Sequence, residues 1–403
     1  MTMQWKEVLL GELVEIKHGY AYKGEYFVDE KTNNILLTPG NFAIGGGFQW
    51  GKLKFYNGPV PDDYILNEGD LVVTMTDLSK AADTLGYSAI IPHSEKILLH
   101  NQRIGKVIRK TSSVDYKYLN YQLRTRAYRN EILASATGST VKHTSPTKIC
   151  AYRFKLPPLN EQQDIASVLS VIDDKIENNL IINEKLEEIA RAIFKSWFVD
   201  FDPVYAKASG NTPSHMNAKT ASLFPSSFSD YGLPIKWEQR KVSKFANAVL
   251  GGTPSRNNPT YWGGDIPWIN SGAVNSFRIL EGTELITKDG LLNSSTKLLP
   301  INTTVIAITG ATLGQVSYLE IETCANQSVV GVIPNKKYAH EWVYFSILSN
   351  IERLTNLQTG GAQQHINKND VLNFNVLYPT EEIILNFSEI VRPLFKKIAN
   401  SLQ

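Results

Sequence analysis

An ordered set of short paired segments constrains the fold of this 403-residue chain more than any other feature. In order, the pairs are Trp5–Glu7 with Trp237–Gln239, His100–Gln102 with Ala325–Gln327, Thr137–His143 with Thr359–His365, and Leu156–Glu161 with Leu377–Glu382. From the second pair to the last, the offset falls only from 225 to 221 residues. Because the order is kept, the pairs predict two copies of one plan, each with mixed short strands followed by a helix.

Length and composition agree with this plan. The chain is too long for one ordinary core, and its 42% hydrophobic and 20% charged residues are typical of globular proteins. No apolar run approaches the ~18 residues of a membrane span, and no signal peptide is recognisable, so we expect a cytoplasmic protein without membrane contact. The two cysteines, Cys150 and Cys324, are far apart, which argues against a disulfide framework or a zinc site.

Runs of β-branched residues predict strands in both copies. They lie at 71–77, 87–92 and 103–109 in the first copy, and at 303–309 and 328–334 in the second. Helical patterns follow at 115–133 and 340–357. Between the copies, residues 201–236 are rich in Ser, Pro, Gly and Asn, which predicts an irregular, extended linker.

A long helical seam begins after the two prolines at 157 and 158. Steps of four and three connect Ile165, Leu169, Ile172, Ile176, Asn179, Asn183, Leu186, Ala190, Ile193 and Trp197. This 3.5-residue repeat predicts a coiled-coil seam about 50 Å long. A second helix near the C-terminus has similar steps at Ile383, Phe387, Ile390, Val391, Leu394 and Ile398, with Pro393 expected to kink it or break its hydrogen-bond ladder.

Two asparagines interrupt the apolar seam. A buried Asn at such a position costs stability but fixes the register of the helix pair, which is one interpretation of Asn179 and Asn183. The other is that both face solvent where the seam opens. If the two helices pair antiparallel, a pseudo-twofold axis relates the copies, and the helices form a spacer between two heads.

Charge is unevenly distributed. Residues 96–155 carry thirteen Lys and Arg against two Asp and Glu, whereas residues 1–95 carry seven against thirteen and residues 156–202 carry four against ten. A basic segment of this kind favours a polyanion such as nucleic acid. The alternative is a solvated surface shared by several elements.

No catalytic grouping is recognisable. Residues 258–261 (NPTY) differ by one residue from an amino-methyltransferase motif, and no cofactor-binding glycine loop accompanies them. What remains is binding chemistry, in which Arg and Lys read guanine and Asn and Gln read adenine. The polar runs GSTVKH (138–143) and GGAQQH (360–365) follow helix ends and suit either DNA contact or a structural turn. Asn101, Gln102 and their counterparts Asn326 and Gln327 are interpreted as buried polar residues that satisfy loop backbone.

Several segments together carry a resemblance to a known family. They are residues 156–208, GSTVKHTSP at 138–146, MTDLSK at 75–80, and GGTPS with YWGGDIPW between 251 and 268. The chain resembles the specificity subunit of type I restriction–modification systems over essentially its whole length.

The resemblance implies an α+β protein with two similar α/β target-recognition domains separated by long helices that form an antiparallel coiled coil. The implied domains are 1–157 and 237–378 for recognition, 158–200 and 379–403 for the helices, and 201–236 for the linker. Each recognition domain would read one half of a split, asymmetric double-stranded DNA sequence. The helices would set the gap and dock two N6-adenine methyltransferase subunits and, through them, the restriction and translocase subunits.

The resemblance also implies that the chain has no catalytic residue, metal or cofactor of its own. S-adenosylmethionine, ATP and Mg²⁺ would belong to the partner subunits. Our candidate DNA-binding residues are Lys80, Arg103, Lys142, His143 and Lys148 in the first domain and Arg256, Asn257, Gln363, Gln364 and Lys368 in the second. The seam residues above, with Phe387 and Leu394, are the candidates for helix pairing and partner docking.

Two points stay open. The second helix stops about 20 residues after Glu382, shorter than the family pattern, so part of a docking surface would be absent or supplied by another copy. Two rival functions are a methyltransferase–nuclease fusion, disfavoured by the missing cofactor loop, and an assembly rod whose heads bind protein.

Overall fold

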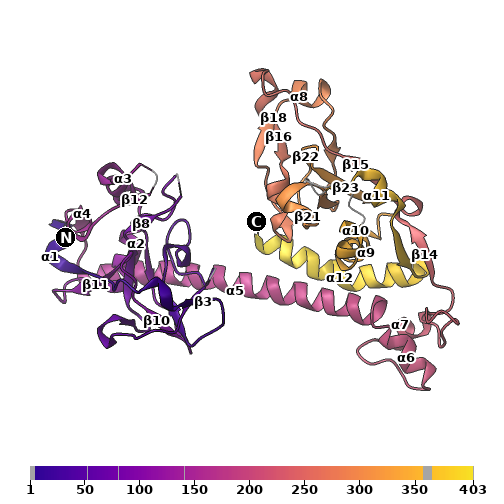
Figure 1. The fold of residues 1–403 in the computed structure, drawn as a ribbon, viewed down its shortest axis with the longest axis horizontal. Helices are drawn as coiled ribbons and strands as arrows, with labels where there is room; N and C mark the ends of the chain where they lie inside the picture. Colours follow the sequence, from indigo (N-terminus) through magenta and orange to yellow (C-terminus); the bar gives the residue numbers. More distant parts are fainter. Residues whose placement is uncertain (1–4, 52, 80, 140, 357–364, 403) are drawn as a thin grey trace. The chain divides into compact units, whose positions relative to one another are not determined.

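The computed structural model describes residues 5–51, 53–79, 81–139, 141–356 and 365–402 (Figure 1). The chain divides into two compact units, Met1–Glu177 and Asn178–Gln403. Helix α5 (Leu159–Phe198) contributes its first half to the first unit and its second half to the second. The prediction of a long central helix is therefore confirmed, and its 40 residues make it about 60 Å long.

The first unit is built on two sheets. The four-stranded sheet has the order β2-β11-β7-β9 and the five-stranded sheet the order β3-β5-β4-β10-β6, while β1 pairs with β13 and β8 with β12. The strands are β1 Lys6–Leu9, β2 Val14–His18, β3 Phe27–Val28, β4 Asn34–Leu36, β5 Lys54–Tyr56, β6 Ile65–Leu66, β7 Leu71–Thr74, β8 Thr76–Asp77, β9 Ser88–Ile90, β10 Ile97–Leu99, β11 Ile104–Arg109, β12 Lys142–His143 and β13 Arg153–Leu156.

Four short helices accompany these sheets before α5 begins. They are α1 Leu10–Leu13, α2 Tyr116–Gln122, α3 Arg126–Ser135 and α4 Pro146–Cys150. The single helix predicted at 115–133 is thus two helices. The division has a local cause, because the Thr125 hydroxyl caps α3 by accepting a hydrogen bond from the Tyr128 N–H at 3.3 Å.

The second unit repeats the plan. Its sheets have the orders β15-β23-β20-β21-β17 and β18-β16-β22-β19, and β14 pairs with β24. The strands are β14 Glu238–Lys241, β15 Ala246–Leu250, β16 Trp262–Ile269, β17 Arg278–Ile279, β18 Glu284–Ile286, β19 Leu298–Leu299, β20 Thr304–Ala307, β21 Val316–Leu319, β22 Thr323–Ala325, β23 Val329–Pro334 and β24 Asn375–Tyr378. The run β15-β23-β20-β21 corresponds to β2-β11-β7-β9, so the prediction of two copies is confirmed.

The helices of the second unit include two that lie in the predicted linker. The two in the linker are α6 Asp202–Ala208 and α7 Ala218–Leu223. The others are α8 Lys288–Leu292, α9 His340–Ser349, α10 Ile351–Thr355, α11 Lys368–Asn373 and α12 Glu381–Leu402. The linker is not simply extended, because Val204 and Phe224 are buried in the same core as Trp237. The high content of Ser, Pro and Gly in this segment made these buried apolar residues hard to recognise in the sequence.

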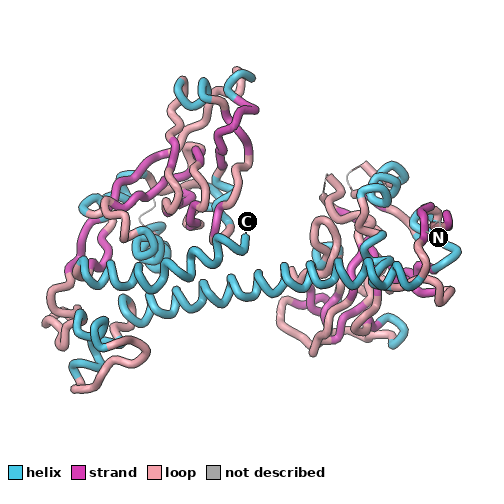
Figure 2. Tube along the Cα trace, turned by 180° about the vertical axis from the view of Figure 1, so that it is seen from behind, coloured by secondary structure: helices cyan, strands magenta, loops and turns pink. Residues whose placement is uncertain are grey.

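A two-stranded ribbon closes each unit. Strand β1 pairs antiparallel with β13, and β14 pairs in the same way with β24. Figure 2 shows the strands of both units in magenta and the helices in cyan. In each unit the ribbon joins an early strand to the last one, and the long helix α5 or α12 follows the last strand directly. Each helix therefore leaves its unit from a fixed point.

Gln162 anchors the start of α5 in the first unit. Its fully buried side chain accepts a hydrogen bond from the Asp115 N–H at 2.9 Å and donates to the Ser113 and Pro157 carbonyls at 2.9 and 2.8 Å. About three turns further along α5, Asp173 accepts hydrogen bonds from Tyr121 and Arg124 at 3.0 and 2.8 Å. These contacts join α5 to the loop before α2 and to α2 itself.

In the second unit, α12 runs antiparallel to the second half of α5. Ser401 donates a hydrogen bond to Asn183 at 2.6 Å. Nearer the other end of the pair, the Phe387 ring lies 5.7 and 5.2 Å from the rings of Phe194 and Phe198. The Asn183 amide nitrogen is buried without a partner among the described residues, so Asn183 is a half-satisfied polar group in the seam.

The predicted seam is covered only in part. Leu186, Ala190, Ile193 and Trp197 are buried or half-buried, and Asn179 is half-buried. Ile172 and Ile176, in contrast, are 51% and 54% exposed. A coiled coil along the whole seam therefore stays a prediction.

Pro393 neither ends nor divides α12, which continues to Leu402. A proline has no N–H, so the helix loses one hydrogen bond at this point. The apolar side of α12 compensates, because Phe387, Val391 and Phe395 are buried in the core of the second unit and Ile398 is buried as well. Tertiary packing thus outweighs the local cost of the proline.

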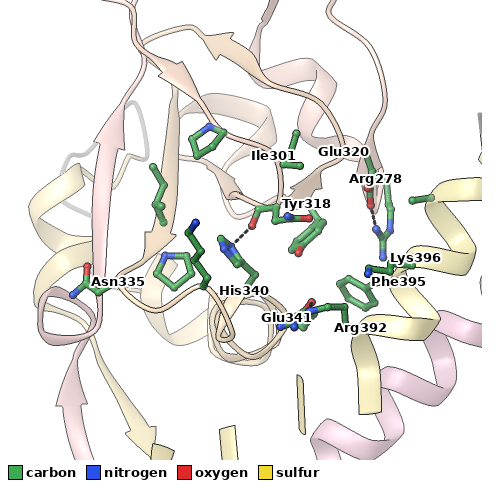
Figure 3. Close-up of a pocket in the computed structure, with 16 residues that line it drawn as sticks. Arg278, Ile301, Tyr318, Glu320, Asn335, His340, Glu341, Arg392, Phe395 and Lys396 are labelled. Atoms are coloured by element: carbon green, nitrogen blue, oxygen red, sulfur yellow. Dashed lines mark hydrogen bonds and ion pairs between the residues drawn. The ribbon is translucent and has the colours of Figure 1, made fainter. Parts of the chain in front are cut away.

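Charged pairs tie α12 to the rest of its unit around a cavity of about 700 Å³ (Figure 3). Arg392 forms a two-bond ion pair with Glu341 of α9 at 2.9 and 3.2 Å. Arg278 of β17 is ion-paired with Glu320, and its guanidinium carbon lies 4.1 Å from the centroid of the Phe395 ring. Burial lowers the pKa of Arg278 to about 10. Because Arg392 and Phe395 belong to α12, the ion pair with Glu341 and the contact with Arg278 hold this helix against α9 and β17.

Replacing Phe387 with alanine should lower the free energy of unfolding of the full chain by about 3–5 kcal/mol, because a fully buried aromatic ring is removed. Urea denaturation followed by circular dichroism measures the change. Leu385→Ala is the matched control, because Leu385 lies exposed on the same helix and should cost much less. Equal losses in the two variants would contradict this packing of α12.

His100 generates a prediction on pH. It is fully buried next to β10, and its Nε2 lies 2.9 Å from the Ile104 carbonyl. Burial lowers its pKa from 6.5 to about 4. The unfolded chain therefore binds a proton below pH 6.5 that the folded chain does not, so stability is full above 6.5 and falls toward pH 4.

Between pH 7.5 and 5.0, His100 should account for a loss of about 2 kcal/mol in the free energy of unfolding. Urea denaturation at both values should show a flatter pH dependence in His100→Gln than in the unsubstituted chain. His93→Gln, at an exposed histidine of the same unit, is the matched control for the loss of a histidine side chain. A His100→Gln variant with the original pH dependence would refute the assignment.

Candidate nucleic-acid interface

A cleft of about 590 Å³ opens in the first unit. Its walls come from the loops around β4 and β5, from the segment after β8 and from the turn between β10 and β11. The lining is mixed, with aromatic and apolar side chains beside amides and cations: Tyr22, Phe27, Leu36, Thr38, Pro39, Gly40, Phe42, Ile44, Gln49, Lys54, Asp77, Leu78, Ser79, Asp83, Thr84, Asn101, Gln102 and Arg103. A concave surface with such a lining is a default binding-site candidate.

The turn between β10 and β11 presents two unengaged polar side chains at this cleft. Asn101 is buried, and its side-chain oxygen accepts a hydrogen bond from the Arg103 N–H at 3.3 Å. Gln102 and Arg103 are exposed, and neither side chain bonds to any residue that the structure describes. The prediction of a buried polar residue therefore holds for Asn101 and not for Gln102.

The second unit has the same turn with different side chains. Asn326 accepts a hydrogen bond from the Ser328 N–H at 3.0 Å, as Asn101 does from Arg103. The Ser328 carbonyl accepts from the Ile308 N–H at 2.9 Å, a bond that matches Met75 to Arg103 at 2.8 Å in the first unit. Serine thus stands where the first unit has arginine.

The glutamine of the turn also differs between the units. The side-chain oxygen of Gln327 accepts a hydrogen bond from the Thr253 hydroxyl at 2.6 Å, whereas Gln102 is unengaged. The two turns share their backbone support and differ in the groups that they offer to a ligand.

The two polar runs predicted at 138–143 and 360–365 end at equivalent places. His143 in β12 pairs with Thr76 of β8, and its Nδ1 lies 3.1 Å from the Thr76 hydroxyl. His365 forms an isolated β-bridge with Thr309 in the second unit. Lys142, beside His143, is half-buried and pairs across the strands with Asp77. Lys142 and His143 therefore lie next to the segment that lines the cleft.

Several of the basic side chains in residues 96–155 are bonded to partners within the protein. The Lys148 ammonium donates to the Ser135 carbonyl at 2.5 Å, so this candidate supports the end of α3. Similar internal partners occupy Lys106, Lys110, Arg124 and Arg129. The basic excess read from the sequence therefore overstates the charge that the surface offers to DNA.

In the second unit, Arg256 is held by its own neighbours. It forms a two-bond ion pair with Glu284 at 2.6 and 2.7 Å, and its guanidinium carbon lies 3.6 Å from the Trp262 ring centroid. The hydrogen bonds that Arg256 donates to Glu284 raise the pKa of Arg256. Asn257 beside it is exposed, and Lys368 lies half-buried in the first turn of α11.

Three candidates, Lys80, Gln363 and Gln364, lie outside the described residues. For none of the candidates does the structure test a DNA contact, so all ten stay predictions. The sequence reasoning missed Tyr22, Phe27 and Ile44, which line the cleft. Among the other lining residues, Asp77, Leu78 and Ser79 carried a signal, because they belong to the MTDLSK run of the family resemblance.

Metal and membrane chemistry find no support in the part of the chain that the structure describes. There, no group of three or more His, Cys, Asp and Glu side chains is placed to hold a metal ion. None of the helices described is long and apolar enough to cross a membrane.

Known proteins are similar to this chain in sequence and in fold. The chain is 28% identical over 319 residues to the Type I restriction enzyme HindI specificity subunit of Haemophilus influenzae, covering 68% of this chain and 69% of the relative. It is 24% identical over 320 residues to the MjaIX specificity subunit of Methanocaldococcus jannaschii, covering 79% and 70%. The crystal structure of a Type-I restriction-modification system S subunit from M. genitalium has the same fold, with a TM-score of 0.58 at 15% identity over 99% of this chain and 91% of that one.

A family model decides the assignment. The model described as the Type I restriction modification DNA specificity domain matches residues 3–188 and again residues 234–401, one match for each copy of the repeat. The two matches cover most of the chain, and the chain therefore belongs to the type I restriction–modification DNA specificity family.

Proposed function

We propose that the chain is the sequence-reading subunit of a type I restriction–modification complex, and that its two repeated domains read the two halves of a bipartite, asymmetric DNA target. One observation carries this proposal. The same turn occurs in both domains, but it offers Gln102 and Arg103 in the first and a tethered Gln327 with Ser328 in the second. One scaffold with two sets of polar groups suits two different half-sites.

The chemistry of the first turn fits base reading. An arginine can donate two hydrogen bonds to the O6 and N7 acceptors of guanine, and a glutamine can pair with adenine. Both side chains are exposed at the cleft without internal partners in the described chain, so they need not break a contact to bind. Lys142 and His143 would then hold the phosphate backbone near the same edge.

The central helix suits the docking of partner subunits. Besides Ile172 and Ile176, its exposed apolar side chains include Val168, Val171, Leu180, Ile181, Ile182 and Ile189. Such a series on one helix is typical of a protein contact. The proposed partners are two N6-adenine methyltransferase subunits and, through them, restriction and translocase subunits.

In this assignment the chain itself is not catalytic and works in the cytoplasm. S-adenosylmethionine, ATP and Mg²⁺ would be bound by the partner subunits. Detectable binding of S-adenosylmethionine by the isolated chain would instead favour the rival methyltransferase–nuclease fusion.

Reconstitution with the methyltransferase subunit of the same system tests the function. Single-molecule mapping of methylated adenines should give one bipartite sequence with a fixed gap. A complex that retains no duplex in a gel at low salt would favour the assembly rod instead.

Arg103→Ala should weaken binding to the mapped target by about 1–3 kcal/mol and relax one position of one half-site, because a guanine-reading group is lost. Fluorescence anisotropy measures the affinity, and methylation mapping measures the specificity. The control is Arg153→Ala, at an exposed arginine outside the cleft, which should leave both half-sites unchanged. Equal discrimination by Arg103→Ala and the parent would exclude base reading by Arg103.

Lengthening α5 should change the gap and not the half-sites. An insertion of seven residues between Ile176 and Asn179 keeps the 3.5-residue repeat and adds about 10 Å of helix. We expect methylation mapping to show a gap longer by between one and about three base pairs. The double substitution Glu177→Gln and Asn178→Gln at the same place serves as the control. An unchanged gap after insertion would refute the spacer role of α5.

A further inference from the structure

The loop that follows β7 in the first domain and β20 in the second differs in length between the two domains. In the first, the Gly86 N–H donates to the Thr74 carbonyl at 3.0 Å; in the second, the Gly314 N–H donates to the Ala307 carbonyl at 2.9 Å. The bonded residues are twelve positions apart in the first domain and seven in the second. The first domain therefore carries five extra residues between matching anchor points.

Asp77 holds the start of this longer loop. One carboxylate oxygen accepts a hydrogen bond from the Ser79 N–H at 2.6 Å, and the other accepts from the Thr84 N–H and hydroxyl at 2.5 and 2.7 Å. Burial alone would raise the pKa of Asp77, but the hydrogen bonds from Thr84 and Ser79 outweigh it and lower that pKa. The Asp77 carboxylate therefore connects the two ends of the loop through hydrogen bonds.

A second support lies beneath the end of the loop. The buried Arg129 of α3 donates to the Ala82 and Leu85 carbonyls, and its guanidinium carbon lies 4.6 Å from the Tyr87 ring centroid. Both ends of the longer loop are thus attached to the domain. In the second domain, Gly310 occupies the position that follows the β-bridged threonine, where the first domain has Asp77.

Leu78, which directly follows Asp77, presents an apolar side chain to the cleft. Leu78 is 61% exposed and lines the same cleft as Arg103 and the 76% exposed Ile44. A single exposed leucine is common on protein surfaces. Here, however, it follows a residue that forms three hydrogen bonds to fix its position, and it lies at the proposed base-reading turn.

We propose that Leu78 is a specificity-determining residue that contacts the C5 methyl group of a thymine in the half-site read by the first domain. An apolar contact with this methyl group is a recognised way to distinguish T·A from the other base pairs in the major groove. Asp77 is the positioning residue, because its hydrogen bonds fix the backbone on both sides of Leu78. The inference rests on the proposed DNA-reading function.

Methylation mapping of the reconstituted complex tests this role. Leu78→Ser should relax one T·A position in one half-site and leave the other half-site unchanged, while Leu78→Met should keep the original sequence. Leu133→Ser, at an exposed leucine of α3 outside the cleft, is the matched control and should change nothing. Unchanged sequences in Leu78→Ser would overturn the inference.

A base analogue tests the contact itself. Replacing the thymine of that position with uracil removes only the methyl group and should weaken binding by the parent complex roughly fourfold. The same replacement should not affect binding by the Leu78→Ser complex. Equal effects of uracil on both complexes would exclude a methyl contact with Leu78.

Asp77→Asn tests the positioning role. The asparagine cannot accept all three hydrogen bonds, so the loop should loosen and the T·A position affected by Leu78→Ser should relax. A loss of stability with unchanged specificity would reduce Asp77 to a structural residue. A parent complex that methylates no bipartite sequence would instead refute the proposed function, independently of Leu78.

Discussion

The rest of the structure depends on the pairing of an early strand with the last strand in each domain. In the first domain the ribbon places Lys6 opposite Leu156, and in the second it places Glu238 opposite Tyr378. Each ribbon closes a domain and fixes the point from which its long helix leaves. Under the proposed function, this separation would let the loops that read DNA change without moving the helix that docks the partner subunits.

The sequence allowed the repeat and the central helix to be predicted, because both depend on local order and periodicity. Which parts of the seam are covered by a partner helix was harder to predict from the sequence. A 3.5-residue repeat states which side chains share a face, but not whether a partner covers them, and Ile172 remains exposed where Trp197 is buried. The two short helices in the linker were missed because buried anchors such as Val204 are sparse among polar residues.

The candidate site was harder to predict than the fold. Arg103 and Lys148 are equivalent in a sequence scan, but one is unengaged at a cleft and the other donates to the Ser135 carbonyl. Arg256 is likewise neutralised by Glu284, 28 residues away along the chain. A cation's availability depends on partners that only the fold brings near. The comparison of Arg103 with Ser328 needed the matching backbone hydrogen bonds of both turns.

Helix α5 is one uninterrupted helix of 40 residues from Leu159 to Phe198, and this continuity has a geometric consequence. A helix cannot be lengthened without being rotated, since each added residue advances it by about 1.5 Å and turns everything beyond it by about 100°. B-DNA advances by about 3.4 Å per base pair, and its rotation per base pair differs from the rotation per residue of an α-helix. If the two domains read one duplex as proposed, only some insertions would therefore bring both of them back onto one face of the DNA. The lengths of the gap between half-sites that such a protein could read would then form a few separate values rather than a continuous range.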